Sequence, residues 1–121
     1  MNIAVIGSDY LTPEQTSAAV YVLDSFFCRY ATGAPVLITQ GKPGVELIAR
    51  RLAKTWNWAN TLEYKPDSGK FWGMLKWQEI HAKIAKDCHI VICVRDRYLD
   101  TRNKVADKAR RYNKKVIEVF V

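Results

Sequence analysis

Short apolar segments alternate with amphipathic ones along the chain, and this pattern constrains the fold more than any other feature. The apolar runs have the length of strands, and the segments between them carry apolar residues at the three- and four-residue spacing of helices. Strands that alternate with helices predict a parallel sheet covered by helices on both faces, connected by right-handed crossovers. We therefore expect a single domain with a five-stranded, Rossmann-like α/β fold. The expected strands are residues 2–6, 35–39, 61–64, 89–94 and 116–120.

The first helix carries a clear start signal. Thr12 is suited to the N-cap, Pro13 to the first turn, and Gln15 to the closing position of a capping box. The other helices are expected from about Val45 to Trp56, from Met74 to Ile84, and over residues 101–113, with Thr101 as a possible cap of the last one.

Ligands of open parallel sheets bind beyond the carboxyl ends of the strands, where the strand order reverses. The loops at those ends are residues 7–11, 40–45, 65–72 and 95–101. Any functional site is therefore expected in these four segments.

Two of these loops contain glycine. The loop Gly41–Gly44 precedes a helix, so its amides and Lys42 can bind an anion; equally, the glycines can serve turn geometry alone. It lacks the ending of a Walker A loop and the spacing of the dinucleotide fingerprint. Gly7 and Ser8 form a second short loop that can offer amides or a hydroxyl to a ligand.

Arginines flank the end of the fourth strand. Arg95, Arg97 and Arg102 can form a fork that matches phosphate geometry, or they can form a solvated basic turn. Thr101 can bond a ligand oxygen. In the loop before the third helix, Phe71 and Trp72 can stack on a base, form a subunit interface or close the core.

The net charge of +7 lies almost entirely in the last third of the chain, where residues 81–121 hold 11 basic and 5 acidic residues. A basic excess suggests a phosphate-bearing partner. On the last helix, Val105, Ala109 and Tyr112 are expected to face the sheet. The opposite side is expected to carry a stripe that is either solvated or contacts nucleic acid through its phosphates: Lys104, Lys108, Arg111 and Lys115.

Composition excludes several classes. No apolar run approaches the roughly 18 residues of a membrane span, and the apolar start lacks the basic residues of a signal peptide. Cys28, Cys88 and Cys93 have neither disulfide nor zinc spacing and are expected to be buried free thiols in a reducing compartment. We expect a cytoplasmic protein with neither a metal site nor a cofactor.

Four segments together resemble the SLOG superfamily, the Rossmann-like group that includes DNA-processing protein A and the LOG phosphoribohydrolases. Residues 6–9 are similar to its GSR opening, and residues 40–49 resemble its GGARGVDxLA loop and helix. Residues 73–80 resemble the GxxRNxxM helix, and residues 100–103 stand where small YspA-like members carry GTR. The resemblance implies a flavodoxin-like sheet, a nucleotide or nucleotide-sugar site at the glycine loops, and a homo-oligomer (a dimer or larger).

The chain departs from the family pattern at positions that matter for catalysis. Gln40 replaces the first glycine of the pair, and Lys76-Trp77 replaces Arg-Asn. The catalytic glutamate of the hydrolases corresponds to Lys104, so only Glu46 remains as a candidate acid or base. The resemblance thus supports binding more strongly than catalysis.

Three functions remain open. The leading hypothesis is a sensor or sequestering protein for a phosphorylated nucleotide or ADP-ribose-type molecule. The alternatives are an N-glycosidic nucleotide hydrolase that uses Glu46 and a nucleic-acid-binding module that uses the last helix. The expected ligand-binding residues are Gly7, Ser8, Asp9, Gly41, Lys42, Pro43, Gly44, Val45, Lys76, Arg95, Thr101 and Arg102.

Overall fold

The structure, a computed structural model, describes residues 1–66, 73–98 and 103–121, with the backbone alone at 73–75. Five parallel strands form one sheet in the order β3-β2-β1-β4-β5. The elements are β1 (Asn2–Gly7), α1 (Pro13–Tyr30), η1 (Ala31–Gly33, a short 3-10 turn), β2 (Val36–Thr39), α2 (Val45–Thr55), β3 (Asn60–Glu63), α3 (Gly73–Asp87), β4 (Ile90–Arg95), α4 (Lys104–Arg111) and β5 (Lys115–Phe120).

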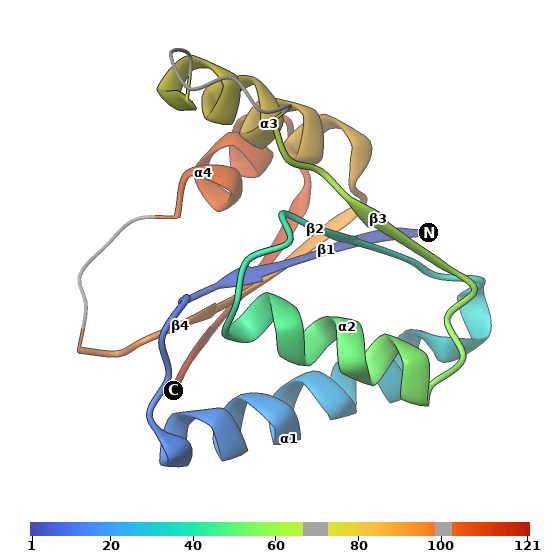
Figure 1. The fold of residues 1–121 in the computed structure, drawn as a ribbon. Coiled ribbons are helices and arrows are strands. Elements are labelled where there is room, and N and C mark those ends of the chain that lie inside the picture. The colour runs from blue at the N-terminus through green and yellow to red at the C-terminus, as the bar shows by residue number, and fades with distance from the viewer. Residues whose placement is uncertain (67–72, 99–102) are drawn as a thin grey trace.

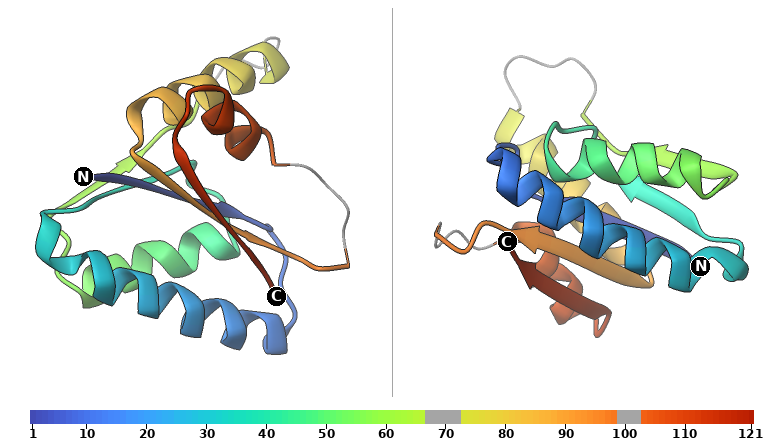
Figure 2. Two further views of the ribbon diagram at one scale, coloured as in Figure 1. Left: turned by 180° about the vertical axis from the view of Figure 1, so that it is seen from behind. Right: turned by 90° about the horizontal axis from the view of Figure 1, so that it is seen from below.

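The helices form a layer on each side of the sheet. Helices α1 and α2 pack side by side on one face, and α3 and α4 cover the other (Figure 1; Figure 2 gives two further views). The expected five-stranded Rossmann-like fold is thereby confirmed. The observed strand order is that of the Rossmann class, whereas a flavodoxin-type sheet has the order 2-1-3-4-5.

Strand β1 lies at the centre of the sheet and is buried on both faces. Ile3 and Val5 belong to the apolar cluster under α1 and α2, and Ala4 and Ile6 to the cluster under α3 and α4. This explains why the strand is a continuous apolar run without alternation. The first crossovers build outward from β1 to β3, and the chain then returns to place β4 on the other side of β1. The carboxyl ends of β1 and β4 therefore mark the reversal of strand order.

Helix α1 begins with the predicted capping box. Thr12 Oγ1 accepts a hydrogen bond from the Gln15 amide at 3.1 Å, and Gln15 Oε1 accepts one from the Thr12 amide at 3.0 Å.

Helix α4 is shorter than predicted and begins later. Its N-cap is Asn103, whose Oδ1 accepts hydrogen bonds from the amides of Val105 and Ala106 at 2.9 and 3.1 Å. Thr101 is therefore not the cap, because the helix starts at Lys104 and an Asn side chain already satisfies its first amides.

We expect Asn103→Ala to lower the free energy of unfolding by about 1 kcal/mol, because two helix amides lose their acceptor. Urea unfolding followed by circular dichroism measures the change. An unchanged midpoint would show that water caps α4 equally well.

The end of α4 also corrects two predictions. Tyr112 is the C-cap residue and is 43% exposed, so it does not pack under the sheet as Val105 and Ala109 do. Lys115 is the first residue of β5, because the helix ends at Arg111 and the chain turns at Asn113 with φ of 58°. The predicted four-residue basic stripe therefore does not follow one helix.

Two expectations from composition can be compared with the described residues. No helix there is long and apolar enough to cross a membrane. All three cysteines are free; Cys88 and Cys93 are buried as expected, whereas Cys28 is exposed because it lies on the outer side of α1.

Candidate functional site

A pocket of about 250 Å³ opens where the strand order reverses. Its floor and walls come from elements far apart in sequence: the end of β1, the β2–α2 loop, the middle of α3 and the first turn of α4. The residues that line it are Gly7, Gln40, Lys42, His81, Asn103, Lys104 and Val105. This is the place where ligands bind in open α/β sheets.

The charges at the pocket are positive. Lys42 lines it from the β2–α2 loop and Lys104 from the first turn of α4, and Lys108 is close enough to act electrostatically on His81. Among residues 1–66, 73–98 and 103–121, none of these three lysines forms an ion pair. The Nζ of Lys42 instead lies 5.0 Å from the centre of the Trp77 ring. Ammonium groups without a counterion beside a pocket favour an anionic ligand.

Glu46, in the first turn of α2, is fully buried behind this pocket. Its Oε1 accepts a hydrogen bond from the backbone amide of Gln40, and its Oε2 accepts one from Gln40 Nε2 at 3.4 Å. Burial raises the pKa of Glu46 to about 7, although the Gln40 amide and Lys42 both favour the charged form. The carboxyl group is thus poised to change its charge near neutral pH.

His81 lies on α3, buried opposite Glu46. Its Nε2 is 3.1 Å from Gln40 Oε1, and its ring lies against Trp77 with centroids 5.8 Å apart. Burial, together with the charges of Lys42, Lys104 and Lys108, lowers the pKa of His81 to about 4. The imidazole is therefore neutral at physiological pH.

The β2–α2 loop turns its backbone amides inward. The amide of Gln40 donates to Glu46, that of Gly41 donates to Thr39 Oγ1 at 3.3 Å, and that of Lys42 also favours the Glu46 carboxylate. Glu46 thus occupies the position that an anion would take in a loop of this kind. The loop serves the pocket through the side chains of Gln40 and Lys42.

The glycines of this loop have steric roles. Gly44 has φ of +75°, and a Cβ there would lie 2.2 Å from the carbonyl oxygen of Ser8. The same carbonyl accepts the Val45 amide at 3.1 Å, so it completes the start of α2. A Cβ on Gly41 would meet the carboxylate of Glu63, which pairs with Arg50 and Lys65.

The structure brings only part of the predicted site together. Gly7 and Lys42 line the pocket, and Gly41, Pro43, Gly44 and Val45 belong to the loop beside it. Ser8 supports this loop through its carbonyl oxygen, which accepts the Val45 amide, and Asp9 acts electrostatically on Glu46. Lys76 is on α3 but is not among the residues that line the pocket. Thr101, Arg102, Phe71 and Trp72 lie outside the described residues.

Arg95 points toward the outer strand. Its guanidinium pairs with Glu118 on β5 at 3.2 Å and stacks over the Phe120 ring at 5.4 Å. Glu118 also pairs with Arg110 at 3.1 Å. Arg95 at the end of β4 and Arg110 in the last turn of α4 are thus both engaged with a carboxylate on β5.

The basic residues of α4 divide differently from the prediction. Lys104 lines the pocket and also a second hollow of about 300 Å³, which Lys108 and Arg111 line with Gln78 and Asp107. Lys104 therefore joins the pocket at the strand ends to the second hollow, which lies between α3 and α4.

Sequence reasoning missed three residues that line the pocket. In the sequence, Gln40 stands out only as a departure from a glycine pair, His81 lies in no motif, and Asn103 lies two residues after the expected cap Thr101. A polar residue at the end of an apolar strand was the available signal for Gln40. No local pattern could place His81 opposite it, since the two are 41 residues apart.

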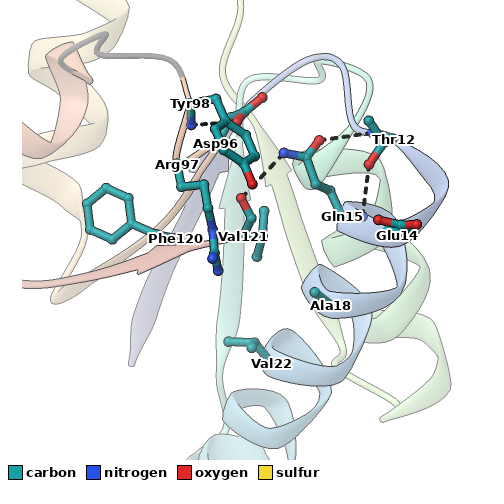
Figure 3. A pocket seen from close by; sticks show the side chains of 10 residues that line it. All are labelled: Thr12, Glu14, Gln15, Ala18, Val22, Asp96, Arg97, Tyr98, Phe120 and Val121. Carbon is teal, nitrogen blue, oxygen red and sulfur yellow. Dashed lines mark hydrogen bonds between the residues drawn. The ribbon is translucent and has the colours of Figure 1, made fainter.

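A larger hollow of about 460 Å³ lies elsewhere, between the first turns of α1 and the end of β5. Figure 3 shows its lining, with Val22 and Ala18 on the helix side and Arg97 and Phe120 on the strand side. Gln15 crosses one end and donates to the carbonyl of Val121 at 3.4 Å. It lies away from the reversal of strand order and shares no residue with the lysine-lined pocket.

The fold can be compared with known structures. The chain is similar in fold to DNA processing protein A. The structure of that protein from Streptococcus pneumoniae aligns with a TM-score of 0.67 and 13% identity over 97% of this chain. The Helicobacter pylori protein, described for its single-stranded DNA binding mode, aligns with a TM-score of 0.62 and 17% identity over 98% of this chain. The Rossmann-like α/β fold implied by the sequence motifs is thereby confirmed, whereas the flavodoxin-like sheet is not, because the strand order is β3-β2-β1-β4-β5.

A third structure, that of the protein TM1055, aligns with a TM-score of 0.63 and 15% identity over 95% of this chain and 71% of its own length. The chain spans 64% of the Helicobacter protein and 49% of the Streptococcus protein. No protein-family model matches the sequence, and no curated protein matches it.

Within the described residues, no group of three or more His, Cys, Asp or Glu side chains is placed to hold a metal ion. The chemistry that the pocket offers is that of two ammonium groups, an amide, an asparagine and a neutral imidazole.

Proposed function

We propose that the protein binds a phosphorylated nucleotide-type small molecule, with a phosphate held between Lys42 and Lys104, and acts as a sensor or sequestering protein. One observation carries the proposal: two lysines without ion-pair partners in the described part of the chain line a pocket at the reversal of strand order. Lysine is a strong phosphate-binding group, and charged hydrogen bonds are the most stabilising kind.

The size of the pocket indicates which part of the ligand it receives. Its volume of about 250 Å³ is below the roughly 300–1,000 Å³ typical of sites for drug-sized molecules. We therefore assign a phosphate and its sugar to this pocket. The adjoining hollow that shares Lys104 offers room for a second phosphate, as an ADP-ribose-type ligand would require.

We expect Lys42→Gln and Lys104→Gln each to weaken binding of ADP-ribose about tenfold, because each removes a charged hydrogen bond worth about 1.5 kcal/mol. The matched control is Lys54→Gln, which makes the same charge change in the last turn of α2, at the other end of that helix from the pocket. Isothermal titration against ADP-ribose and adenosine monophosphate measures the affinities. Equal losses of affinity in all three variants would show that only the net charge matters and would contradict the proposal.

A specific observation also favours a second function, binding of single-stranded nucleic acid. The hollow between α3 and α4 continues the pocket with Lys108 and Arg111, and one protein of the same fold binds single-stranded DNA. A polyanion on this track would show a steep fall of affinity with salt. If a short oligonucleotide binds with a steep salt slope and Arg111→Gln weakens it while leaving ADP-ribose binding unchanged, the second function is favoured.

The described residues do not favour hydrolysis by Glu46. Its carboxyl group is fully buried and bonded to Gln40, and Gln40, not Glu46, lines the pocket. General acid catalysis requires a group within hydrogen-bond reach of the bond that breaks.

A further inference from the structure

Three buried side chains form a chain of polar contacts behind the lysines. Glu46 on α2 accepts from the side-chain amide of Gln40, and the oxygen of the same amide faces Nε2 of His81 on α3. These contacts thus connect the carboxyl group of Glu46, through the side-chain amide of Gln40, to the imidazole ring of His81, which lines the pocket. All three residues are at least nine-tenths buried, so these contacts are largely shielded from water.

The charge on Glu46 determines which atoms donate and which accept in the contacts among Glu46, Gln40 and His81. A carboxylate only accepts hydrogen bonds, so Gln40 must turn its Nε2 toward Glu46 and its Oε1 toward His81. A neutral imidazole next to an amide oxygen must then carry its proton on Nε2. Its Nδ1 is left as an acceptor, and within the described residues this buried atom has no hydrogen-bond partner.

Protonation of Glu46 reverses the pattern. The backbone amide of Gln40 already occupies Oε1, so the new hydroxyl is on Oε2 and needs an acceptor. Rotation of the Gln40 amide by half a turn supplies its oxygen to that hydroxyl. The amide nitrogen then faces His81 Nε2, which must accept, and the imidazole proton moves to Nδ1. The proton count of the imidazole stays the same, because one nitrogen loses the proton that the other gains through solvent exchange.

We propose that Glu46 is a positioning residue of the pocket, which decides through the Gln40 amide which nitrogen of His81 carries the proton. With Glu46 charged, Nδ1 of His81 is an acceptor; with Glu46 neutral, it is a donor. The proposal concerns the regulation of the pocket and rests on the proposed function only where it predicts how a ligand is affected.

Charged residues around Glu46, Gln40 and His81, which we call the relay, link it to anion binding. Glu46 faces Lys42, which favours its charged form, and Asp9, which opposes it. His81 faces Lys42 together with Lys104 and Lys108 on α4, which keep it neutral. An anion bound at Lys42 offsets that lysine and raises the pKa of Glu46 further above 7, so binding draws a proton onto Glu46. By linkage, affinity for the anion falls as pH rises above about 7.

Nitrogen-15 NMR of the imidazole rings in the ligand-free protein tests the relay, because protonated and unprotonated ring nitrogens have distinct shifts. We expect His81 to change from the Nδ1–H to the Nε2–H form as pH rises through about 7, without taking up a second proton. The signals are assigned by their loss in His81→Gln and by their retention in His89→Gln, which removes the chain's other histidine. A single tautomer from about pH 5 to 9 would overturn the proposal.

Glu46→Gln gives a matched control, since its amide resembles the protonated acid in shape and can donate to Gln40. We expect this variant to hold His81 in the Nδ1–H form at every pH. A tautomer change that persists in Glu46→Gln would also overturn the relay.

Titration of adenosine monophosphate in buffers of different ionisation enthalpy separates the relay from the proposed function. We expect uptake of a fraction of a proton near pH 7.5 in the wild type and none in Glu46→Gln. Absence of any nucleotide binding, with the tautomer change intact, would overturn the proposed function and leave the relay supported. Nucleotide binding without a tautomer change of His81 would overturn the relay and leave the proposed function supported.

Discussion

Gly44→Ala is expected to lower the free energy of unfolding by about 3 kcal/mol, because two costs add at this position. A backbone with φ of +75° is strained for any residue with a Cβ, at about 1–3 kcal/mol. The new Cβ would also lie 2.2 Å from the Ser8 carbonyl oxygen, which is backbone and cannot move without disturbing the start of α2.

The matched control is Gly33→Ala, at a glycine where an added Cβ meets nothing within 4 Å. We expect this change to alter stability by less than about 1 kcal/mol. Urea unfolding of both variants checks the pair. Equal free energies of unfolding for the two variants would show that the β2–α2 loop relaxes without cost. That result would contradict the tight packing of Gly44 against Ser8.

The second large effect is on the pH dependence of stability, where Glu46 and His81 act in opposite directions. The pKa of Glu46 is higher in the folded protein than the ordinary 4.5, so the folded state binds more protons and stability falls as pH rises from about 4.5 to 7. The pKa of His81 is lower than the ordinary 6.5, so stability rises with pH between about 4 and 6.5. The effects of Glu46 and His81 on the pH dependence of stability therefore largely cancel in the wild type.

Single variants should reveal each slope. We expect Glu46→Gln to become more stable with rising pH up to about 6.5, and His81→Gln to become less stable as pH rises toward 7, by up to about 3 kcal/mol. Unfolding by urea at several pH values measures both. Parallel pH profiles for the two variants would contradict the opposed shifts.

Much of the fold could be predicted because its signals are local. The continuous apolar run of β1 and the Thr12–Gln15 box each depend on neighbours within a few residues, and both predictions are confirmed. The start of α4 is harder to predict, because threonine and asparagine are both good N-caps and the observed cap is Asn103.

The candidate site was less predictable because it depends on contacts between distant segments. The glycine loop fits either an anion cradle or a tight turn, and the choice depends on Glu46, whose buried carboxylate engages the loop amides. Arg95 has the residue type of a phosphate ligand, but Glu118 on the neighbouring strand pairs with it. Strand order alone brings Gln40, His81 and Lys104 to one pocket.

The positively charged residues fall into two groups, those paired with a carboxylate and those that line or adjoin the pocket. Arg95 and Arg110 share Glu118, whereas Lys42, Lys104 and Lys108 have no carboxylate partner in the described parts of the chain. The excess charge relevant to a ligand therefore lies at the pocket and the start of α4.

Amide chemical-shift mapping during titration with ADP-ribose shows where the ligand binds without the need for a mutation. We expect the largest shifts at the residues that line the pocket, and we expect them to saturate together: Gly7, Gln40, Lys42, Asn103 and Lys104. Saturable shifts confined to the larger hollow, at Thr12, Gln15, Tyr98 and Phe120 (Figure 3), would place the ligand elsewhere and contradict it.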